Sequence, residues 1–405
     1  MKKPWKCTAG SWAEALLFKD LEKRTMISWH ARLGLILIAV LVPSCAGADD
    51  FNDSVDAIFA QIDAATDPGC SVGVLAGGEL IHRSGYGLAN LELDVPLDGT
   101  QVHRIGSVSK QFTAFAVLLL AEEGKVHLEE DIRVYLPELR SYGYPVSINA
   151  VLGHVAGMAD YDYVSGGYDG PVEGGLNLSS VAGGPFRLGN EDYLSIQEFF
   201  DVVKQVPLRQ APNESYRYSN LGYFLLSMLI ETVSGESLRE YAARQIFEPL
   251  GMRNTFFSDD PVEIVKNRAS GYRPEAGGYV TDMTNLFWVG DGGLHTNVDD
   301  LALWDAHFYE PTLGLNPEAL MARFLTPNSP LPSAPDTLYA NGQNIGTANG
   351  KERIYHSGGW LGVTTFYARY PAEQFSTVLL CNDVSLSPSS LSEQIERLYF
   401  SSRKH

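Results

Sequence analysis

The alternation of apolar and polar residues predicts paired strands near both ends of the chain. In the stretch CSVGVLAGGELIHRSG, two strand-like runs meet at Gly77-Gly78, a pair of residues typical of tight hairpin turns. In VTTFYARYPAEQFSTVLLCND, strands expected around Val363–Tyr370 and Phe375–Cys381 are joined by a turn that begins with proline. Hairpins at both ends indicate an antiparallel sheet built from the N- and C-terminal segments.

Apolar residues at helical spacing predict helices between these hairpins. The stretch RIGSVSKQFTAFAVLLLAEEG, residues 104–124, repeats apolar side chains every three or four positions and stops at Gly124. Asn220–Gly235 and Ser237–Gly251 show the same period, each with a glycine stop. The glycine-rich residues 161–190 lack a period, so we expect an irregular loop that either covers a binding site or simply crosses the surface. The whole pattern predicts an α/β (α+β) fold in which an α-rich region is inserted into a scaffold with an antiparallel sheet.

Composition and charge exclude several classes of function. The 405 residues are 45% hydrophobic and 20% charged, which is ordinary for a globular protein. The formal net charge of −19 repels phosphate backbones, so we expect no nucleic-acid partner. The histidines and cysteines show no ligand spacing, so we expect no metal. Cys70 and Cys381 lie in apolar strand-like runs, where a free buried thiol is the commoner state, although an exported protein could pair them.

The N-terminal residues 1–48 are interpreted as a signal-peptide region, with Met26 as an alternative start. The run LGLILIAVLV, Leu33–Val42, is too short to span a bilayer, which needs about 20 apolar residues, but suits the core of a signal peptide. Ala46-Gly47-Ala48 fits a cleavage site. A lipid anchor on Cys45 is the alternative to free secretion and would be the only link to a membrane. Either reading predicts an exported protein, periplasmic or secreted.

A serine and a lysine three residues apart open the helix expected after Arg104. Ser107 and Lys110 would share one face of its first turn. Burying an unpaired ammonium is costly, so Lys110 needs a partner or a use. Two further polar motifs stand at the start of predicted elements, Tyr218-Ser219-Asn220 before a helix and His356-Ser357-Gly358 before the C-terminal strands.

Together these motifs resemble the serine β-lactamase-related family. The resemblance covers roughly residues 53–400 and rests, in chain order, on RIGSVSKQFTA, VLGHVAGMADY, YRYSNLGYFLLSMLIETVSG, IFEPLGM, GDGGLHTNVDDLALW and HSGGWLG. That family includes class C β-lactamases, D-Ala-D-Ala carboxypeptidases, D-aminopeptidases and family VIII esterases. The resemblance implies a β-lactamase/transpeptidase-like fold over residues 49–405, in which an antiparallel sheet is flanked by helices and a mainly helical lobe is inserted. The α/β lobe would comprise about residues 49–131 and 285–405, and the helical lobe about residues 132–284.

The resemblance also implies a role for each motif residue. Ser107 matches the nucleophile, and Lys110 and Tyr218 match the groups that move its proton, in an order that the sequence leaves open. Asn220 matches the residue that holds the lysine and the substrate amide. The oxyanion hole would be formed by the backbone N–H groups of Ser107 and Gly359. The remaining substrate-binding positions are His356, Ser357 and Gly358.

Two departures from the family pattern bear on the substrate. His356 stands where class C β-lactamases carry the lysine of K-T-G, and a histidine anchors a substrate carboxylate less firmly because it is only partly charged at pH 7. Val155 and Ala156 replace hydroxyl residues after His154, which is interpreted as structural. We therefore expect a cofactor-free serine hydrolase acting on a small-molecule or peptide substrate: an amide, a D-amino-acid peptide, including fragments of peptidoglycan, or a small ester. A class C-like β-lactamase and a penicillin- or peptidoglycan-binding module with little turnover are the alternatives.

Overall fold

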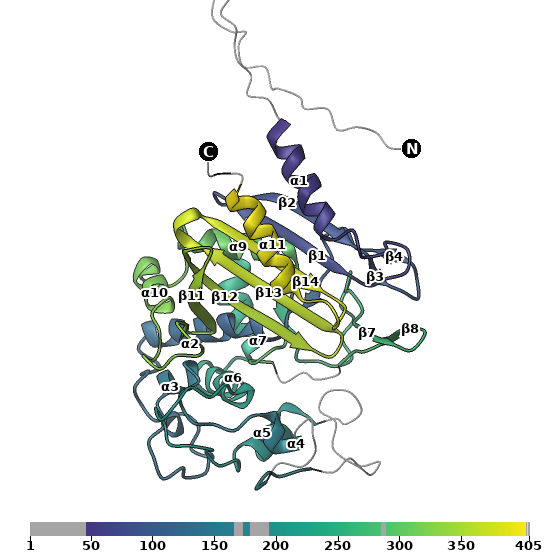
Figure 1. The fold of residues 1–405 in the computed structure, drawn as a ribbon. Helices are drawn as coiled ribbons and strands as arrows, with labels where there is room; N and C mark the ends of the chain where they lie inside the picture. Colours follow the sequence, from purple (N-terminus) through teal and green to yellow (C-terminus); the bar gives the residue numbers. More distant parts are fainter. Residues whose placement is uncertain (1–45, 166–172, 179–193, 285–288, 402, 404–405) are drawn as a thin grey trace, which may run out of the picture. The chain divides into compact units, whose positions relative to one another are not determined.

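The two ends of the chain meet in a central antiparallel sheet, as the two hairpins predict. The computed structural model describes residues 46–165, 173–178, 194–284, 289–401 and 403. Among these residues, a seven-stranded sheet has the order β10-β11-β12-β13-β14-β1-β2 (Figure 1). Its strands are β1 (Cys70–Ala76), β2 (Glu79–Tyr86), β10 (Leu338–Ala340), β11 (Gln343–Ala348), β12 (Lys351–Trp360), β13 (Val363–Tyr370) and β14 (Phe375–Cys381). Every neighbouring pair is antiparallel, which confirms the predicted sheet.

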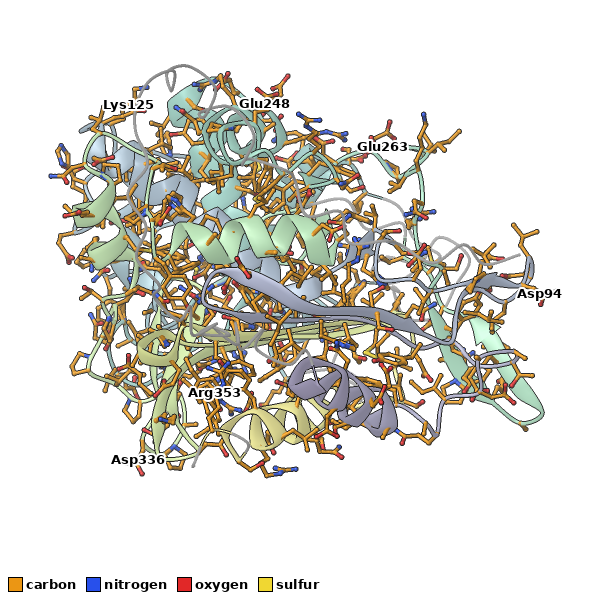
Figure 2. All side chains as sticks on the ribbon, turned by 90° about the horizontal axis from the view of Figure 1, so that it is seen from above. Asp94, Lys125, Glu248, Glu263, Asp336 and Arg353 are labelled. Carbon is orange, nitrogen blue, oxygen red and sulfur yellow. A yellow bond between two sulfur atoms is a disulfide. The ribbon has the colours of Figure 1, made fainter. Side chains whose placement is uncertain are left out.

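Helices cover both faces of this sheet because its strands alternate apolar side chains between two cores. Leu379 faces a layer formed with α1 (Ala46–Ile58) and α11 (Pro388–Ser401), whereas Val378 faces the core that holds α2 (Lys110–Glu122) and α9 (Val298–His307). Figure 2 shows these helices on opposite sides of the sheet. Arg353, labelled there on β12, contacts the fully buried Glu396 of α11 at 3.3 Å and so ties that helix to the sheet.

A second, mainly helical region packs against α2 through the larger core. Its central helix α6 (Asn220–Ser234) is almost entirely buried and ends at Gly235, whose φ of 76° is left-handed. This helix has the predicted bounds. Among the described residues, the other α-helices in the middle of the sequence are α3 (Ile148–Leu152), α4 (Tyr161–Ser165), α5 (Ile196–Val203), α7 (Leu238–Ala242), α8 (Glu248–Leu250) and α10 (Pro317–Phe324). Residues Ala46–His405 form one compact unit.

The remaining strands of the described residues lie outside the central sheet. They are β3 (Leu88–Asn90), β4 (Val95–Pro96), β5 (His103–Arg104), β6 (Phe256–Phe257), β7 (Tyr272–Glu275), β8 (Gly278–Thr281) and β9 (Leu294–Thr296). These strands form smaller sheets in the orders β3-β4, β5-β9-β6 and β7-β8. The middle strand β9 pairs with both β5 and β6. The β5–β9 pairing holds the chain directly before Ser107, since the Ile105 N–H donates to the Leu294 carbonyl at 3.0 Å.

Two predicted helices differ from the observed ones. The helix whose first turn is predicted to contain both Ser107 and Lys110 begins only at Lys110, because Gly106–Ser109 form a 3₁₀ turn. The helix predicted over Ser237–Gly251 is interrupted by a π-helical segment, Ala243–Phe247. Pro249 follows this segment and has no N–H to donate to the carbonyl four residues earlier, so the regular α-helical ladder cannot continue through it.

Cys70 and Cys381 form a disulfide, whereas the sequence pattern favours free thiols. The two residues stand directly opposite each other in the β1–β14 register, with Cα atoms 4.0 Å apart. They are separated by 311 positions, so only the pairing of the chain's two ends brings them together.

Part of the segment expected to be irregular is helical. Tyr161–Ser165 form α4, and residues 173–178 are described without helix or strand. The rest of that segment, residues 166–172 and 179–190, lies outside the described residues, as does the signal-peptide region up to Cys45.

Candidate active site

The candidate nucleophile Ser107 lies in the 3₁₀ turn between β5 and α2. This turn packs directly against β12. A Cβ atom placed on Gly106 would lie only 2.8 Å from the Gly359 nitrogen, and the Gly106 φ is +52°. Glycine accommodates both the conformation and the approach. The backbone amide of Gly359 therefore lies beside the serine turn, as the predicted oxyanion hole requires.

Lys110 is fully buried and directed at Ser107. Its Nζ lies 3.1 Å from Ser107 Oγ, 2.7 Å from Asn220 Oδ1 and 2.6 Å from the Asp291 carbonyl oxygen. The amide and carbonyl oxygens can only accept, so each takes one N–H of the amine. In a neutral lysine the remaining position on Nζ is a lone pair, and it faces the serine hydroxyl.

Burial brings the Lys110 pKa into the range of a general base. It lowers the pKa from 10.5 to about 8, against the opposing negative charges of Asp291 and Asp160. A substantial neutral fraction at mildly alkaline pH follows, which makes proton removal from Ser107 feasible.

Asn220 is held at the start of α6 by Asp160. The Asn220 backbone N–H donates to Asp160 Oδ1 at 2.8 Å, and its side-chain Nδ2 donates to Asp160 Oδ2 at 3.2 Å. Sequence reasoning missed Asp160, although it lies within the family-like stretch VLGHVAGMADY, because nothing in that stretch indicates a partner 60 residues away.

Asp291 is a second acidic residue that sequence reasoning missed. Its carbonyl accepts from Lys110, while its carboxylate Oδ2 accepts from the Tyr161 hydroxyl at 2.6 Å. Burial raises the pKa of this carboxyl, and the positive charges of Lys110 and Arg104 oppose that rise. Tyr161, the first residue of the segment expected to be irregular, is thus hydrogen-bonded within the protein.

Tyr218 packs against the amine of Lys110. Lys110 Nζ lies 4.8 Å from the centre of the Tyr218 ring, and the His154 ring lies 4.2 Å away on another side. The Tyr218 hydroxyl is buried and forms no hydrogen bond with any described residue. The nearby Ser107 hydroxyl nevertheless opposes the rise of the Tyr218 pKa that burial causes. Burial holds that pKa well above 10, so Tyr218 keeps its proton at neutral pH.

His154 has a structural role, because its ring holds the start of α6 through a hydrogen bond. Its Nδ1 accepts the Ser219 backbone N–H at 3.2 Å, at the residue that caps α6. Burial and the charge of Lys110 lower the His154 pKa well below 6.5, so the ring is neutral.

Strand β12 forms the wall of the site opposite Lys110 and Tyr218, and from His356 on its successive residues alternate between more buried and more exposed positions. Ser357 and Gly359 are exposed, whereas a Cβ atom on Gly358 would lie 2.1 Å from the Ile105 carbonyl oxygen. The buried His356 ring lies 6.2 Å from the Tyr218 ring. The structure thus brings all the predicted site residues to one place, with Ser357 beside the others on β12.

Both ring nitrogens of His356 are occupied by protein groups. Nδ1 lies 2.5 Å from the Ser357 carbonyl, which can only accept, so Nδ1 carries the proton and Nε2 accepts from the Tyr339 hydroxyl at 3.0 Å. Burial, assisted by the charge of Lys110, lowers the His356 pKa to about 4. The ring is therefore neutral at pH 7, not partly charged as the sequence suggests.

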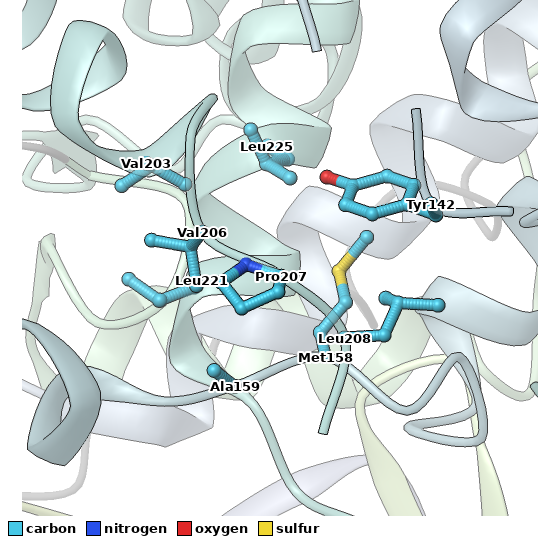
Figure 3. Close-up of a pocket in the computed structure, with 9 residues that line it drawn as sticks. All are labelled: Tyr142, Met158, Ala159, Val203, Val206, Pro207, Leu208, Leu221 and Leu225. Carbon is cyan, nitrogen blue, oxygen red and sulfur yellow. The ribbon is translucent and has the colours of Figure 1, made fainter. Parts of the chain in front are cut away.

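The described residues contain no group of three or more His, Cys, Asp or Glu side chains that could hold a metal ion. In the same part of the chain, no helix is both long and apolar enough to cross a membrane. A small apolar pocket lies beside α6 at Leu221 and Leu225 and is lined by none of the predicted catalytic residues (Figure 3).

The chain is similar to known proteins over most of its length. The profile of the Beta-lactamase family matches residues 55–397. The chain is 27% identical over 348 residues to the D-aminopeptidase of Gluconobacter oxydans, covering 84% of this chain and 60% of that protein. It is 26% identical over 338 residues to penicillin-binding protein 4* of Bacillus subtilis, covering 76% and 66%. The chain therefore spans about three fifths to two thirds of the length of these relatives.

Solved structures show the same fold. The octameric penicillin-binding protein homologue from Pyrococcus abyssi has a TM-score of 0.72 at 26% identity, covering 88% of this chain and 77% of that one. EstCE1, a hydrolase with promiscuous acyltransferase activity, has a TM-score of 0.72 at 21% identity, with 87% and 100% covered. The D-amino acid amidase from Ochrobactrum anthropi SV3 has a TM-score of 0.67 at 20% identity, also with 87% and 100% covered. With a family match over most of its length, this chain belongs to the Beta-lactamase family.

Proposed function

We propose that the protein hydrolyses an amide, a D-amino-acid peptide or a small ester through an acyl-enzyme on Ser107. The observation that carries this proposal is the 3.1 Å contact between Ser107 Oγ and Lys110 Nζ, with the other N–H groups of the amine directed to oxygens that can only accept. This arrangement leaves the lone pair of a neutral lysine for the serine proton.

The geometry supports a two-step reaction. Ser107 Oγ attacks the substrate carbonyl carbon while its proton passes to Lys110 Nζ, and the N–H groups of Ser107 and Gly359 stabilise the negative oxygen that forms. The carbon–leaving-group bond then breaks, and Tyr218 donates the proton that the leaving group needs and is reprotonated from Lys110. Water attacks the acyl-serine ester with the same groups acting in reverse, releasing the acid and restoring Ser107.

The neutral His356 favours substrates without a carboxylate at this strand. A lysine in its place would offer a full positive charge, whereas the His356 ring is uncharged at pH 7 and already bonded through both nitrogens. We infer that neutral esters and amides, among them D-amino-acid amides, are better substrates than penicillins. The names of the D-aminopeptidase relative, the D-amino acid amidase and the hydrolase EstCE1 support this choice.

Intact-protein mass spectrometry would test the proposal directly. The protein and its Ser107→Ala variant are mixed separately with a p-nitrophenyl acyl ester, a D-amino-acid p-nitroanilide and a penicillin, while product release is followed optically. Ser390→Ala, at an exposed position on α11, is the matched control. We expect an acyl adduct and turnover that require Ser107, and full activity in the control.

The alternatives give different results in the same experiment. Rapid loss of penicillin would indicate a β-lactamase. A stable penicillin adduct without turnover of any substrate would indicate a binding module. Full ester turnover by Ser107→Ala would refute the mechanism.

We also propose that the protein acts outside the cytoplasm. The signal-like run Leu33–Val42 supports export, and the Cys70–Cys381 disulfide suits an oxidising compartment. Mass spectrometry of the N-terminal peptide from the native source would test this. A start at Asp49 would indicate free secretion, a lipid on Cys45 would indicate anchoring, and an uncleaved N-terminus in the cytoplasm would contradict export.

A further inference from the structure

We propose that Asp160 is a positioning residue for Lys110: it fixes the side chain of Asn220 so that the amide oxygen, and not the amide nitrogen, faces the amine. The proposal rests on the proposed function, in which neutral Lys110 removes the Ser107 proton. Asp160 does not touch the reacting atoms in this arrangement and acts through Asn220.

The orientation of Asn220 follows from what a carboxylate can do. An ionised carboxylate only accepts hydrogen bonds, so the Asn220 group 3.2 Å from Asp160 Oδ2 must be the NH₂. The opposite end of the amide, Oδ1, then lies 2.7 Å from Lys110 Nζ. If the amide turned over, its N–H groups would face the N–H groups of Lys110, and the lysine would lose one of the acceptors that direct its lone pair to Ser107.

Asp160 is itself held against the start of α6. Its backbone carbonyl accepts the Tyr163 N–H at 3.0 Å, in the first turn of α4. The neighbouring Ala159 carbonyl accepts the Ser219 hydroxyl at 2.6 Å, and the Asn220 backbone N–H donates to the Asp160 carboxylate at 2.8 Å. Hydrogen bonds of Asp160 and of its neighbour Ala159 therefore hold the carboxylate at the start of α6, which suits a positioning role.

Asp160 also acts on the charge of Lys110. Its carboxylate favours the protonated amine and opposes the effect of burial on the Lys110 pKa. The titratable groups that act on Lys110, contact it or interact with its charge come from several elements: Asp160, Asp291, Tyr218, Tyr223, His154 and His356. Removing the Asp160 charge should lower the Lys110 pKa, and the acid limb of the rate profile should move to lower pH.

The test compares Asp160→Asn with Asp162→Asn. The first variant keeps the shape of the side chain but places an NH₂ where one carboxylate oxygen accepted. The second removes an exposed carboxylate two residues away on α4 and serves as the matched control. We measure kcat and KM for the p-nitrophenyl ester from pH 5 to 10, together with Tm.

We expect Asp160→Asn to lower kcat by about 10- to 100-fold, the usual effect of losing a hydrogen bond to a charged group, with KM changed by less than about threefold. The acid limb should move to lower pH, which a merely destabilised protein would not show. In an Asn220→Ala background, Asp160→Asn should change the pH-independent kcat by less than about twofold, because Asp160 positions Lys110 through that amide, whereas the shift of the acid limb, which depends on the Asp160 charge, should remain. Asp162→Asn should match the parent protein.

Either of two results would contradict the positioning role of Asp160. A kcat within about twofold of the parent for Asp160→Asn, or the same loss with and without Asn220, would overturn the positioning role. If Asp160→Asn fails to fold, Asp160→Ser is measured against the same criteria. Failure of the proposed function is distinguishable, because the parent protein and Ser107→Ala would then have equal activity.

Discussion

Replacing Gly358 by alanine would separate β12 from the serine turn. The added Cβ would lie 2.1 Å from the Ile105 carbonyl oxygen and 2.2 Å from Thr365 Oγ1. These two atoms are themselves bonded, since the Thr365 hydroxyl donates to that carbonyl at 2.7 Å. Cβ contacts below 3.0 Å essentially do not occur, so the backbone at Ile105 must move. Ile105 lies two residues before Ser107.

The size of the effect follows from these distances. The contact with Ile105 must open from 2.1 Å to at least 3.0 Å, a displacement of about 0.9 Å. Misplacing catalytic groups by about 1 Å can cost about 100-fold in rate. Overpacking and the strained Thr365 hydrogen bond together should cost about 2 to 4 kcal/mol of unfolding free energy.

The assay combines ester hydrolysis with thermal unfolding. We expect Gly358→Ala to lower kcat/KM by about 100-fold and to lower Tm by several degrees. Gly359→Ala is the control for stability, because its Cβ would meet nothing within 4 Å and its φ is not left-handed. Its unfolding free energy should change by less than about 0.5 kcal/mol. Wild-type activity and Tm in Gly358→Ala would refute the close approach of β12 to the serine turn.

Two further predictions concern proton transfer. Because only neutral Lys110 accepts a proton and its pKa is about 8, kcat/KM should rise about tenfold per pH unit below that value and level off above it; a flat profile between pH 6 and 8 would contradict Lys110 as the base. Tyr218→Phe should slow a D-amino-acid anilide by about 100-fold or more but a p-nitrophenyl ester much less, because p-nitrophenolate leaves without a proton. Equal losses on both substrates would argue against Tyr218 as the proton donor.

Much of the fold and part of the candidate site could be predicted from local sequence. The strands Val363–Tyr370 and Phe375–Cys381 have the predicted bounds, and α6 begins at Asn220 and ends before Gly235. Strand alternation, helical period, caps and glycine stops act between residues close in the chain, so they are readable without the fold. The Ser107 and Lys110 pair was identifiable for the same reason, since three residues separate its members.

The residues that tune this pair were not predictable in this way. Asp160 reaches Asn220 across 60 positions, and the Asp291 carbonyl reaches Lys110 across 181. The disulfide depends on the register of strands at opposite ends of the chain, and the neutrality of His356 depends on a tyrosine from another strand.

The sequence by itself therefore determined which groups could carry the chemistry and which local elements would hold them. The tertiary structure decided the partners, the protonation states and the exact start of α2 after the serine turn. The physical reason is that burial and hydrogen bonding at this site come from segments distant in sequence, and such contacts exist only once the sheet and α6 have packed around Lys110.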